Sequence, residues 1–71
     1  MPKLPILSGK DIIKILERMG FDNVRQKGSH VVMKKGSVGC VVPMHKEVAI
    51  GTLHGILRQA NISPEDFMNN I

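Results

Sequence analysis

The sequence predicts a small α+β domain in which a helix, three antiparallel strands and a second helix follow one another, with a short helix at the C-terminus. Three observations predict this class. Apolar residues recur at helical spacing in two separate segments. Short β-branched runs, separated by glycine turns, lie between those segments. The 71 residues suffice for one hydrophobic core. We therefore expect a single domain, residues 1–71, with both main helices on one face of the sheet.

The first helix is expected to begin at Ser8. Ser8 with Asp11 three residues later resembles a capping box, with Asp in place of the usual Glu. Prolines in the preceding segment, Met1–Leu7, block a regular helix there, so we expect an ordered arm on the core. The apolar face of the helix consists of Ile12, Ile13, Leu16 and Met19, with Ile15 beside them. Gly20 suits a left-handed helix end, and Phe21 after it is expected to pack back on the last turn.

Three strands are expected in the middle of the chain. They are, in order, Asn23–Lys27, His30–Lys34 and Gly39–Met44. In the first of them, Val24 between polar residues suits a half-buried strand. Gly28-Ser29 is typical of a two-residue hairpin turn, and Lys35–Ser37 is expected to form the second turn. Pro43 cannot donate a ladder hydrogen bond, which indicates an edge strand or a strand exit.

The second helix is expected over Thr52–Ala60, with Thr52 as its N-cap. Its apolar stripe consists of Leu53, Ile56, Leu57 and Ala60. Gly55 inside the helix costs about 1 kcal/mol against Ala, which suggests a close approach of another segment. Asn61 is expected to end the helix.

A short C-terminal helix is expected to run as far as Asn69. Its start is indicated by Ser63 as N-cap and by Pro64 at the first helical position. A proline has no backbone N–H, and the first helical position needs none for the hydrogen bonds of the helix, so Pro64 after Ser63 is a favourable helix start.

The charge balance is basic. Ten Lys and Arg against six Asp and Glu give a net charge of +4, which is typical of, but not specific to, proteins that bind nucleic acid. Phe21 and Phe67 are the two aromatic residues, so a base-stacking platform of the RRM or OB type is not expected. An RNA partner would be held by charge, backbone and shape.

Other function classes are made less probable by composition. The single cysteine, Cys40, cannot form an intramolecular disulfide, and we expect it to be a buried or half-buried small apolar residue. The three histidines have no zinc-site spacing. No apolar run approaches the roughly 20 residues that span a bilayer, and no secretory signal is evident. The sequence therefore predicts a cytoplasmic protein without a metal, a cofactor or a membrane partner.

His30 is the leading candidate for chemistry. A strand has period two, so His30, Val32 and Lys34 are expected to face solvent while Val31 and Met33 face the core. An imidazole titrates near pH 6.5 and serves as a general acid or base. The nearby cations are Lys27, Lys34 and Lys35, and Arg25 lies two residues before Lys27. The plainer alternative is a polar histidine on a solvated strand.

RNA cleavage is the reaction that demands least of such a site. RNA carries its own nucleophile, the 2′-hydroxyl, so the enzyme needs a base or an acid and cations on the phosphate. A cluster of carboxylates that would hold two metal ions is absent from the sequence pattern. His45 and Lys46, in the loop after the third strand, are second candidates, either for acid–base chemistry or for phosphate contact.

Several segments together resemble the HicA family of toxin–antitoxin ribonucleases. They are Leu7–Lys10, Gly20-Phe21, Val24–His30, Val41–His45 and Gly51–Ala60. The run Arg-Gln-Lys-Gly-Ser-His, followed by Pro-x-His and Gly-Thr-Leu, carries most of the likeness. Two positions depart from the family pattern: Val31 stands where many members have a second histidine, and His54 where Arg or Lys is usual.

The resemblance implies a fold similar to double-stranded RNA-binding domains, metal-independent cleavage of mRNA, and His30 as the catalytic residue. It also implies a HicB-type antitoxin that covers this site. Our leading hypothesis is thus an endoribonuclease toxin. In this hypothesis Ser29 shapes the turn and can donate a hydrogen bond, while Lys27, Lys34 and Lys35 bind and neutralise phosphate. His45 and Lys46 are the second candidates for RNA contact. The alternatives are a non-catalytic module for double-stranded RNA and a scaffold whose open sheet face binds protein.

Overall fold

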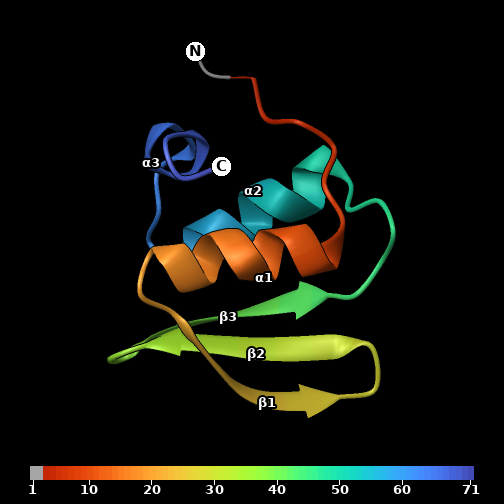
Figure 1. Cartoon of the computed structure of the whole chain (residues 1–71), viewed down its shortest axis with the longest axis vertical. Helices are drawn as coiled ribbons and strands as arrows, with labels where there is room; N and C mark the ends of the chain where they lie inside the picture. The colour runs from red at the N-terminus through yellow and green to blue at the C-terminus, as the bar shows by residue number, and fades with distance from the viewer. Residues whose placement is uncertain (1–2) are drawn as a thin grey trace.

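The computed structural model describes residues 3–71 and confirms the predicted α+β class. The elements are α1 (Gly9–Arg18), β1 (Asp22–Lys27), β2 (His30–Lys35), β3 (Val38–Pro43), α2 (Ile50–Gln59) and α3 (Pro64–Met68). The strands form one antiparallel sheet in the order β1-β2-β3 (Figure 1). The first two residues of the predicted N-terminal arm, Met1 and Pro2, lie outside the described residues.

The sheet has one face covered by helices and one open face. Strand residues on the covered face are buried: Val31, Met33, Cys40 and Val42. They share one core with apolar residues of all three helices, among them Ile12, Leu16, Leu53, Leu57 and Phe67. Residues of the opposite parity, such as Lys34 and Val41, are exposed. The predicted placement of both main helices on one face is therefore confirmed.

β1 is the least protected strand. All six of its residues are exposed, and Figure 1 shows β1 as the strand farthest from the helices. The prediction of a half-buried first strand is wrong, because all of β1 is exposed and the Val24 side chain is itself 53% exposed. The pairing with β2 shifts between Asn23 and Arg25, so Val24 is the extra residue of a β-bulge. The alternation argument fails at such a residue because it has no partner across the ladder.

The ends of α1 follow the sequence prediction. The backbone amide of Asp11 donates to Oγ of Ser8 over 3.0 Å, which caps the first turn. Gly20 adopts a φ of 94°, the left-handed value that a side chain disfavours, and it reverses the chain after the helix. Phe21 then packs into the core, where it is 4% exposed. These contacts fix where β1 starts relative to α1.

Both predicted hairpin turns are present. Lys27 pairs with His30 across the two-residue turn Gly28-Ser29, and Gly28 has a φ of 58°. The second turn is shorter than predicted, because Lys35 belongs to β2 and pairs with Val38. β3 is an edge strand, as the proline near its end indicated. The amide of Val41 donates to Oε1 of Gln59 over 3.2 Å, so α2 protects part of that edge.

Two predictions about α2 are wrong. The helix begins at Ile50, and its N-cap is Ala49 rather than Thr52, so the first turn has no side-chain cap. A Cβ at Gly55 would have its nearest neighbour, on Arg58, 4.0 Å away, so nothing packs closely there. The predicted stripe is buried, and Asn61 ends the helix with a φ of 56°.

α3 confirms its predicted start and is one residue shorter than expected. The amide of Asp66 donates to Oγ of Ser63 over 3.1 Å, and Pro64 opens the helix. The last helical residue is Met68 and Asn69 is the C-cap. Within residues 3–71, no helix has both the length and the apolar character needed to cross a membrane.

Candidate functional site

An open groove lies at the end of the sheet where β1 turns into β2. It is lined by Arg25, Lys27, Gly28, Ser29, His30 and Val32. Lys27 and His30 are direct partners across the antiparallel pair, so their side chains leave the same face about 5 Å apart at Cβ. Arg25 opposes Val32 one step further along the same face. One imidazole and two cationic side chains therefore lie together in the groove.

The strand beneath the imidazole is held rigidly although the ring itself is accessible. Val31 and Met33 are 1% and 0% exposed, and they anchor β2 in the core. His30 and Lys34, on the opposite face, are exposed, as the period of two predicted. A core-anchored strand thus presents an imidazole to solvent.

Backbone hydrogen bonds fix the turn to the first helix. The amide of Met44 donates to the carbonyl of Ser29 over 2.6 Å, and the amide of Gly9 donates to the carbonyl of His45 over 2.9 Å. Within the turn, Nε2 of Gln26 donates to the carbonyl of Gly28 over 3.2 Å. The segment that follows β3 thus connects the start of α1 to the turn that carries His30.

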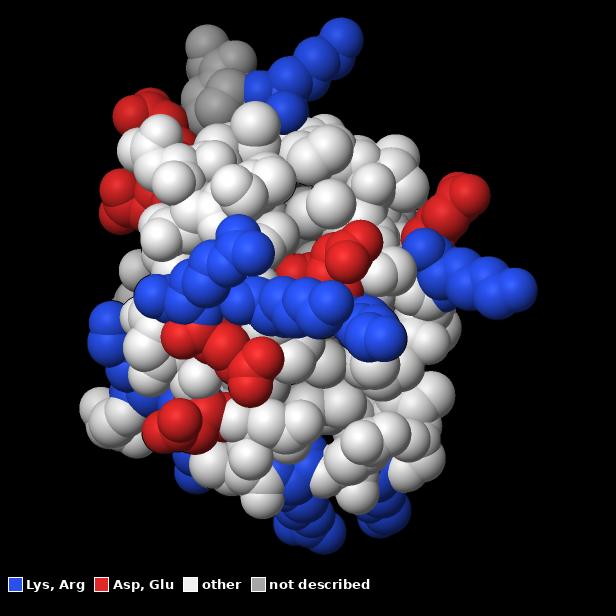
Figure 2. All heavy atoms as spheres, viewed as in Figure 1, with Lys and Arg blue, Asp and Glu red and all other residues white. Residues whose placement is uncertain are grey.

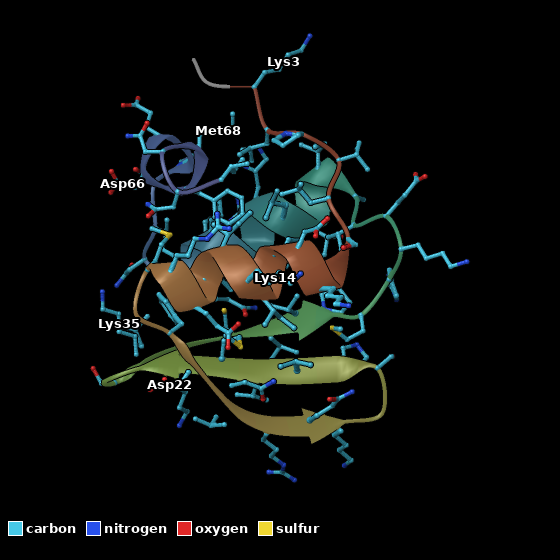
Figure 3. All side chains as sticks on the ribbon, in the orientation of Figure 1. Lys3, Lys14, Asp22, Lys35, Asp66 and Met68 are labelled. Carbon is cyan, nitrogen blue, oxygen red and sulfur yellow. The ribbon has the colours of Figure 1, made fainter. Side chains whose placement is uncertain are left out.

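The three lysines predicted for the site occupy different places. Lys27 lies in the groove. Lys34 shares the open face with His30 but follows it by four strand residues, a separation of about 13 Å. Lys35 lies on the covered side, where Nζ donates to the carbonyl of Met19 over 2.9 Å. Figure 3 shows Lys35 at the end of the sheet opposite the β1–β2 turn. The structure thus gives Lys35 a role at the C-terminal end of α1.

The second candidates, His45 and Lys46, do not line the groove. His45 and Lys46 are exposed in the loop between β3 and α2. The loop starts at Met44, whose amide is bonded to the turn, so His45 follows a residue in direct contact with the site. His54 is half-buried on α2.

Arg25 is a groove residue that the sequence reasoning did not select. The signal was present, because Arg25 and Lys27 are two residues apart in one strand and so share a face. The bulge at Val24 precedes both residues, so their shared face and their pairing with β2 follow directly from the two-residue turn. Counting back two residues from Lys27, which pairs with His30 across the turn, would have placed two cations and the imidazole together.

Positive charge dominates the end of the molecule formed by β1. Figure 2 shows Lys and Arg side chains projecting from that end, where Figure 1 places β1. The outer side of α1 differs, because basic and acidic side chains are mixed there (Figure 2). Its exposed charged residues are Lys10, Asp11, Lys14, Glu17 and Arg18. A polyanion is therefore attracted more strongly to the groove than to the helix.

Two other chemistries find little support in the described part of the chain. No group of three or more His, Cys, Asp or Glu side chains in residues 3–71 is arranged to hold a metal ion. Cys40 is 3% exposed, and burial raises the pKa of its thiol to about 11. A protonated, enclosed thiol is a poor nucleophile. The prediction that Cys40 serves as a small core residue is confirmed.

Comparison with known families identifies the chain. The model of a family described as "HicA toxin of bacterial toxin-antitoxin" matches residues 9–62, which is more than half of the chain. The chain belongs to the HicA toxin family. A HicA toxin is one member of a toxin–antitoxin pair, so an antitoxin partner is implied. The match spans α1 to the end of α2 and contains every residue of the groove. No curated protein gave a significant match.

Proposed function

We propose that the protein is the toxin of a type II toxin–antitoxin system and cleaves mRNA by acid–base catalysis at His30. The observation that carries the proposal is the groove, in which His30 stands directly opposite Lys27 on an exposed face. Membership of a toxin family supplies the biological context. An mRNA target places this action in the cytoplasm.

The proposed step is attack of a ribose 2′-oxygen on the adjacent phosphorus. His30 accepts the 2′-hydroxyl proton while the O2′–P bond forms, and the P–O5′ bond breaks. The leaving O5′ takes up a proton from solvent. The products are a 2′,3′-cyclic phosphate and a 5′-hydroxyl, so atoms and electrons balance without a metal ion or a co-reactant. An imidazole within hydrogen-bond reach of the hydroxyl typically contributes about 10²–10⁴-fold to such a step.

The cations in the groove complement the transition state. Lys27 and Arg25 flank the phosphate that reacts, and their positive charge stabilises the extra negative charge on its oxygens. Ser29 shapes the turn beside them. Lys34, His45 and Lys46 lie outside the groove, and we assign them to phosphates further along the RNA. Lys35 is left out because its ammonium group is engaged by the carbonyl of Met19.

The partner that we propose is a HicB-type antitoxin. It would inhibit by covering the exposed groove, which presents the positive charges of Arg25 and Lys27. An acidic surface on the antitoxin would match the excess of Lys and Arg in the groove. This arrangement would block RNA and neutralise Lys27 and Arg25 together.

The test compares His30→Ala with His54→Ala on single-stranded mRNA in the presence of EDTA. We expect the first substitution to lower the cleavage rate at least 100-fold, because the acid–base group is lost. The second removes a histidine that lies on α2 outside the groove, and it should retain cleavage. Circular dichroism checks that both variants are folded. Equal cleavage by wild-type protein and folded His30→Ala would refute the role of His30.

A second candidate function is a non-catalytic module that binds double-stranded RNA. The order helix, three strands, helix and the basic β1 end favour it. Filter binding separates the two functions: tight binding of a duplex, with no scission of any single strand, would support the module. Binding should weaken steeply with salt in both cases, because phosphate contacts release counterions.

A further inference from the structure

The open face of the sheet has an apolar centre between charged rows. Val32 of β2 is paired with Val41 of β3, so the two side chains lie next to each other on that face. Val41 is 41% exposed and Val32 is half-buried. On the other side of Val32, the paired residue is Arg25. We call the pair Val32 and Val41 the valine strip.

Charged rows lie on either side of the valine strip along the strand direction. The row towards the turn contains Lys27 and His30, and the row away from it contains Lys34 with Asp22 opposite. Rows on one face are two residues apart, about 6.7 Å, which is close to one nucleotide step of an extended strand. Among the described residues in these paired rows, Asp22 at the far end is the one carboxylate.

We propose that the valine strip seats one nucleoside of a single-stranded RNA, next to the phosphate cleaved at His30. This proposal rests on the function proposed above and adds the path of the substrate. The reacting phosphate lies in the row of Lys27 and His30. The neighbouring base rests its flat face on Val32 and Val41, and a phosphate further along reaches Lys34.

The chemistry of the strip selects single strands. In a duplex the faces of the bases are stacked on one another, so they are not available to a protein surface. In a single strand the base can turn onto an apolar surface, which removes both from water. The valines offer no hydrogen-bonding side-chain atoms, so the seat accepts any base. A purine, with its larger face, should be preferred over a pyrimidine.

The strip suits a nucleoside better than it suits a protein anchor. Stable protein interfaces bury about 800 Å² on each partner, and their centres depend on pockets filled by large side chains. Two neighbouring valines on a flat sheet offer a much smaller apolar area. Cations lie beside the strip and beyond it, which complements a polyanion that carries flat bases.

The experiment uses oligodeoxynucleotides that contain a single ribonucleotide, so that one phosphodiester can be cleaved. An abasic site is placed on one side of that bond or on the other, and kcat/KM is measured. We expect about a tenfold loss for the abasic site on one side and under twofold for the other. In Val41→Ser the tenfold loss should fall below threefold, because the seat has lost its apolar surface. Val24→Ser, at an exposed valine outside the strip, should keep the full loss.

Three outcomes would overturn the proposal. An abasic penalty that is the same in Val41→Ser as in the wild type would remove the strip from substrate binding. Cleavage of the same bond in a duplex as fast as in a single strand would contradict the seat. Unchanged cleavage by Val41→Ser together with weakened antitoxin binding would identify the strip as a protein contact.

Failure of the catalytic proposal can be recognised separately. The same oligonucleotides without any ribonucleotide cannot be cleaved, and fluorescence anisotropy measures their affinity. A one-sided abasic penalty in affinity that Val41→Ser abolishes would support the seat even if no RNA were cleaved. Affinities that do not depend on the abasic site in any variant would reject it.

Discussion

The amide of Met44 donates a 2.6 Å hydrogen bond to the carbonyl of Ser29, and this bond connects the β1–β2 turn to the segment after β3. The backbone carbonyl of the next residue, His45, accepts a hydrogen bond from the amide of Gly9 at the start of α1. The turn beside His30 is thus held by α1 through two backbone bonds. The position of the imidazole depends on how closely α1 approaches this segment.

Gly9→Ala should therefore destabilise the protein. A Cβ at Gly9 would clash with the carbonyl oxygen of Pro43 and would lie 2.9 Å from Cα of Met44, and both are backbone atoms that cannot move aside easily. We expect the free energy of unfolding to fall by about 1–3 kcal/mol, the usual cost of overpacking. Urea denaturation monitored by circular dichroism measures it.

The matched control is Gly55→Ala in α2, where the new Cβ would meet nothing closer than 4.0 Å. It should raise the free energy of unfolding by about 1 kcal/mol, because alanine is the better helix former. The same chemical change is thus expected to have opposite signs at the two sites. Shifts of the same sign would contradict the packing described for Gly9.

The two glycines also show what the sequence could and could not predict. Helices, turns and the exposed face of His30 follow from local patterns, namely periodicity, capping residues and glycine turns. Which glycine meets another segment depends on contacts between distant parts of the chain, and the sequence reasoning chose Gly55 instead of Gly9. Arg25 was missed for a different reason: the cations were grouped by nearness to His30 in the sequence, although Arg25 shares a face with Lys27.

The lysines give the same lesson within the candidate site. Nearness in sequence placed Lys27, Lys34 and Lys35 in one group. Lys34 and Lys35 are successive strand residues, however, so their side chains leave opposite faces of the sheet. Only the tertiary contact with Met19 reveals that Lys35 serves the end of α1. Charge runs in a strand therefore need to be divided by face before they are assigned to a site.

A cap added to α2 should stabilise the protein. The N-cap residue Ala49 has extended backbone angles, φ −59° and ψ 144°, and no side chain that could accept from the first turn. Ala49→Ser should raise the free energy of unfolding by about 1 kcal/mol, since its hydroxyl can accept a free amide. Thr52→Ala should change it by less than about 0.5 kcal/mol, because Thr52 is an exposed position inside the helix. Thermal denaturation of both variants tests this, and a larger loss at Thr52 would restore it as the cap.

Cys40 should be protected from thiol reagents in the folded protein. Its side chain is 3% exposed and its thiol pKa is raised to about 11 by burial, so the reactive thiolate is scarce at pH 8. Labelling with a maleimide should be at least tenfold slower in buffer than in 6 M urea. Labelling at equal rates in both solutions would show that the thiol is accessible in the native fold.

The raised pKa also predicts a loss of stability in alkali. Between about pH 9 and pH 11 the unfolded thiol ionises while the folded thiol stays protonated, so the unfolded state is favoured as pH rises. We expect a loss of about 1 kcal/mol from this group between pH 8 and pH 10. Cys40→Ala should lack that contribution, and urea midpoints of both proteins at the two pH values measure the difference. Parallel losses in the two proteins would exclude the thiol as the source.

Lys34→Met and Lys35→Met should separate RNA binding from folding. Lys34 is exposed on the open face with His30, so removing its charge should reduce the slope of log K against log salt by about 0.7, the value for one phosphate contact on a single strand. Lys35→Met should leave that slope unchanged. It should instead lower the free energy of unfolding by about 1 kcal/mol, because the carbonyl of Met19 loses its charged donor.

Salt titrations of binding to a non-cleavable oligonucleotide, together with urea denaturation, measure both quantities on the same two variants. The two substitutions remove the same charge from adjacent residues, so overall charge cannot explain a difference between them. A reduced salt slope in Lys35→Met would mean that its ammonium group leaves the carbonyl of Met19 to contact RNA. A loss of stability in Lys34→Met as large as in Lys35→Met would show that the open face, too, supports the fold.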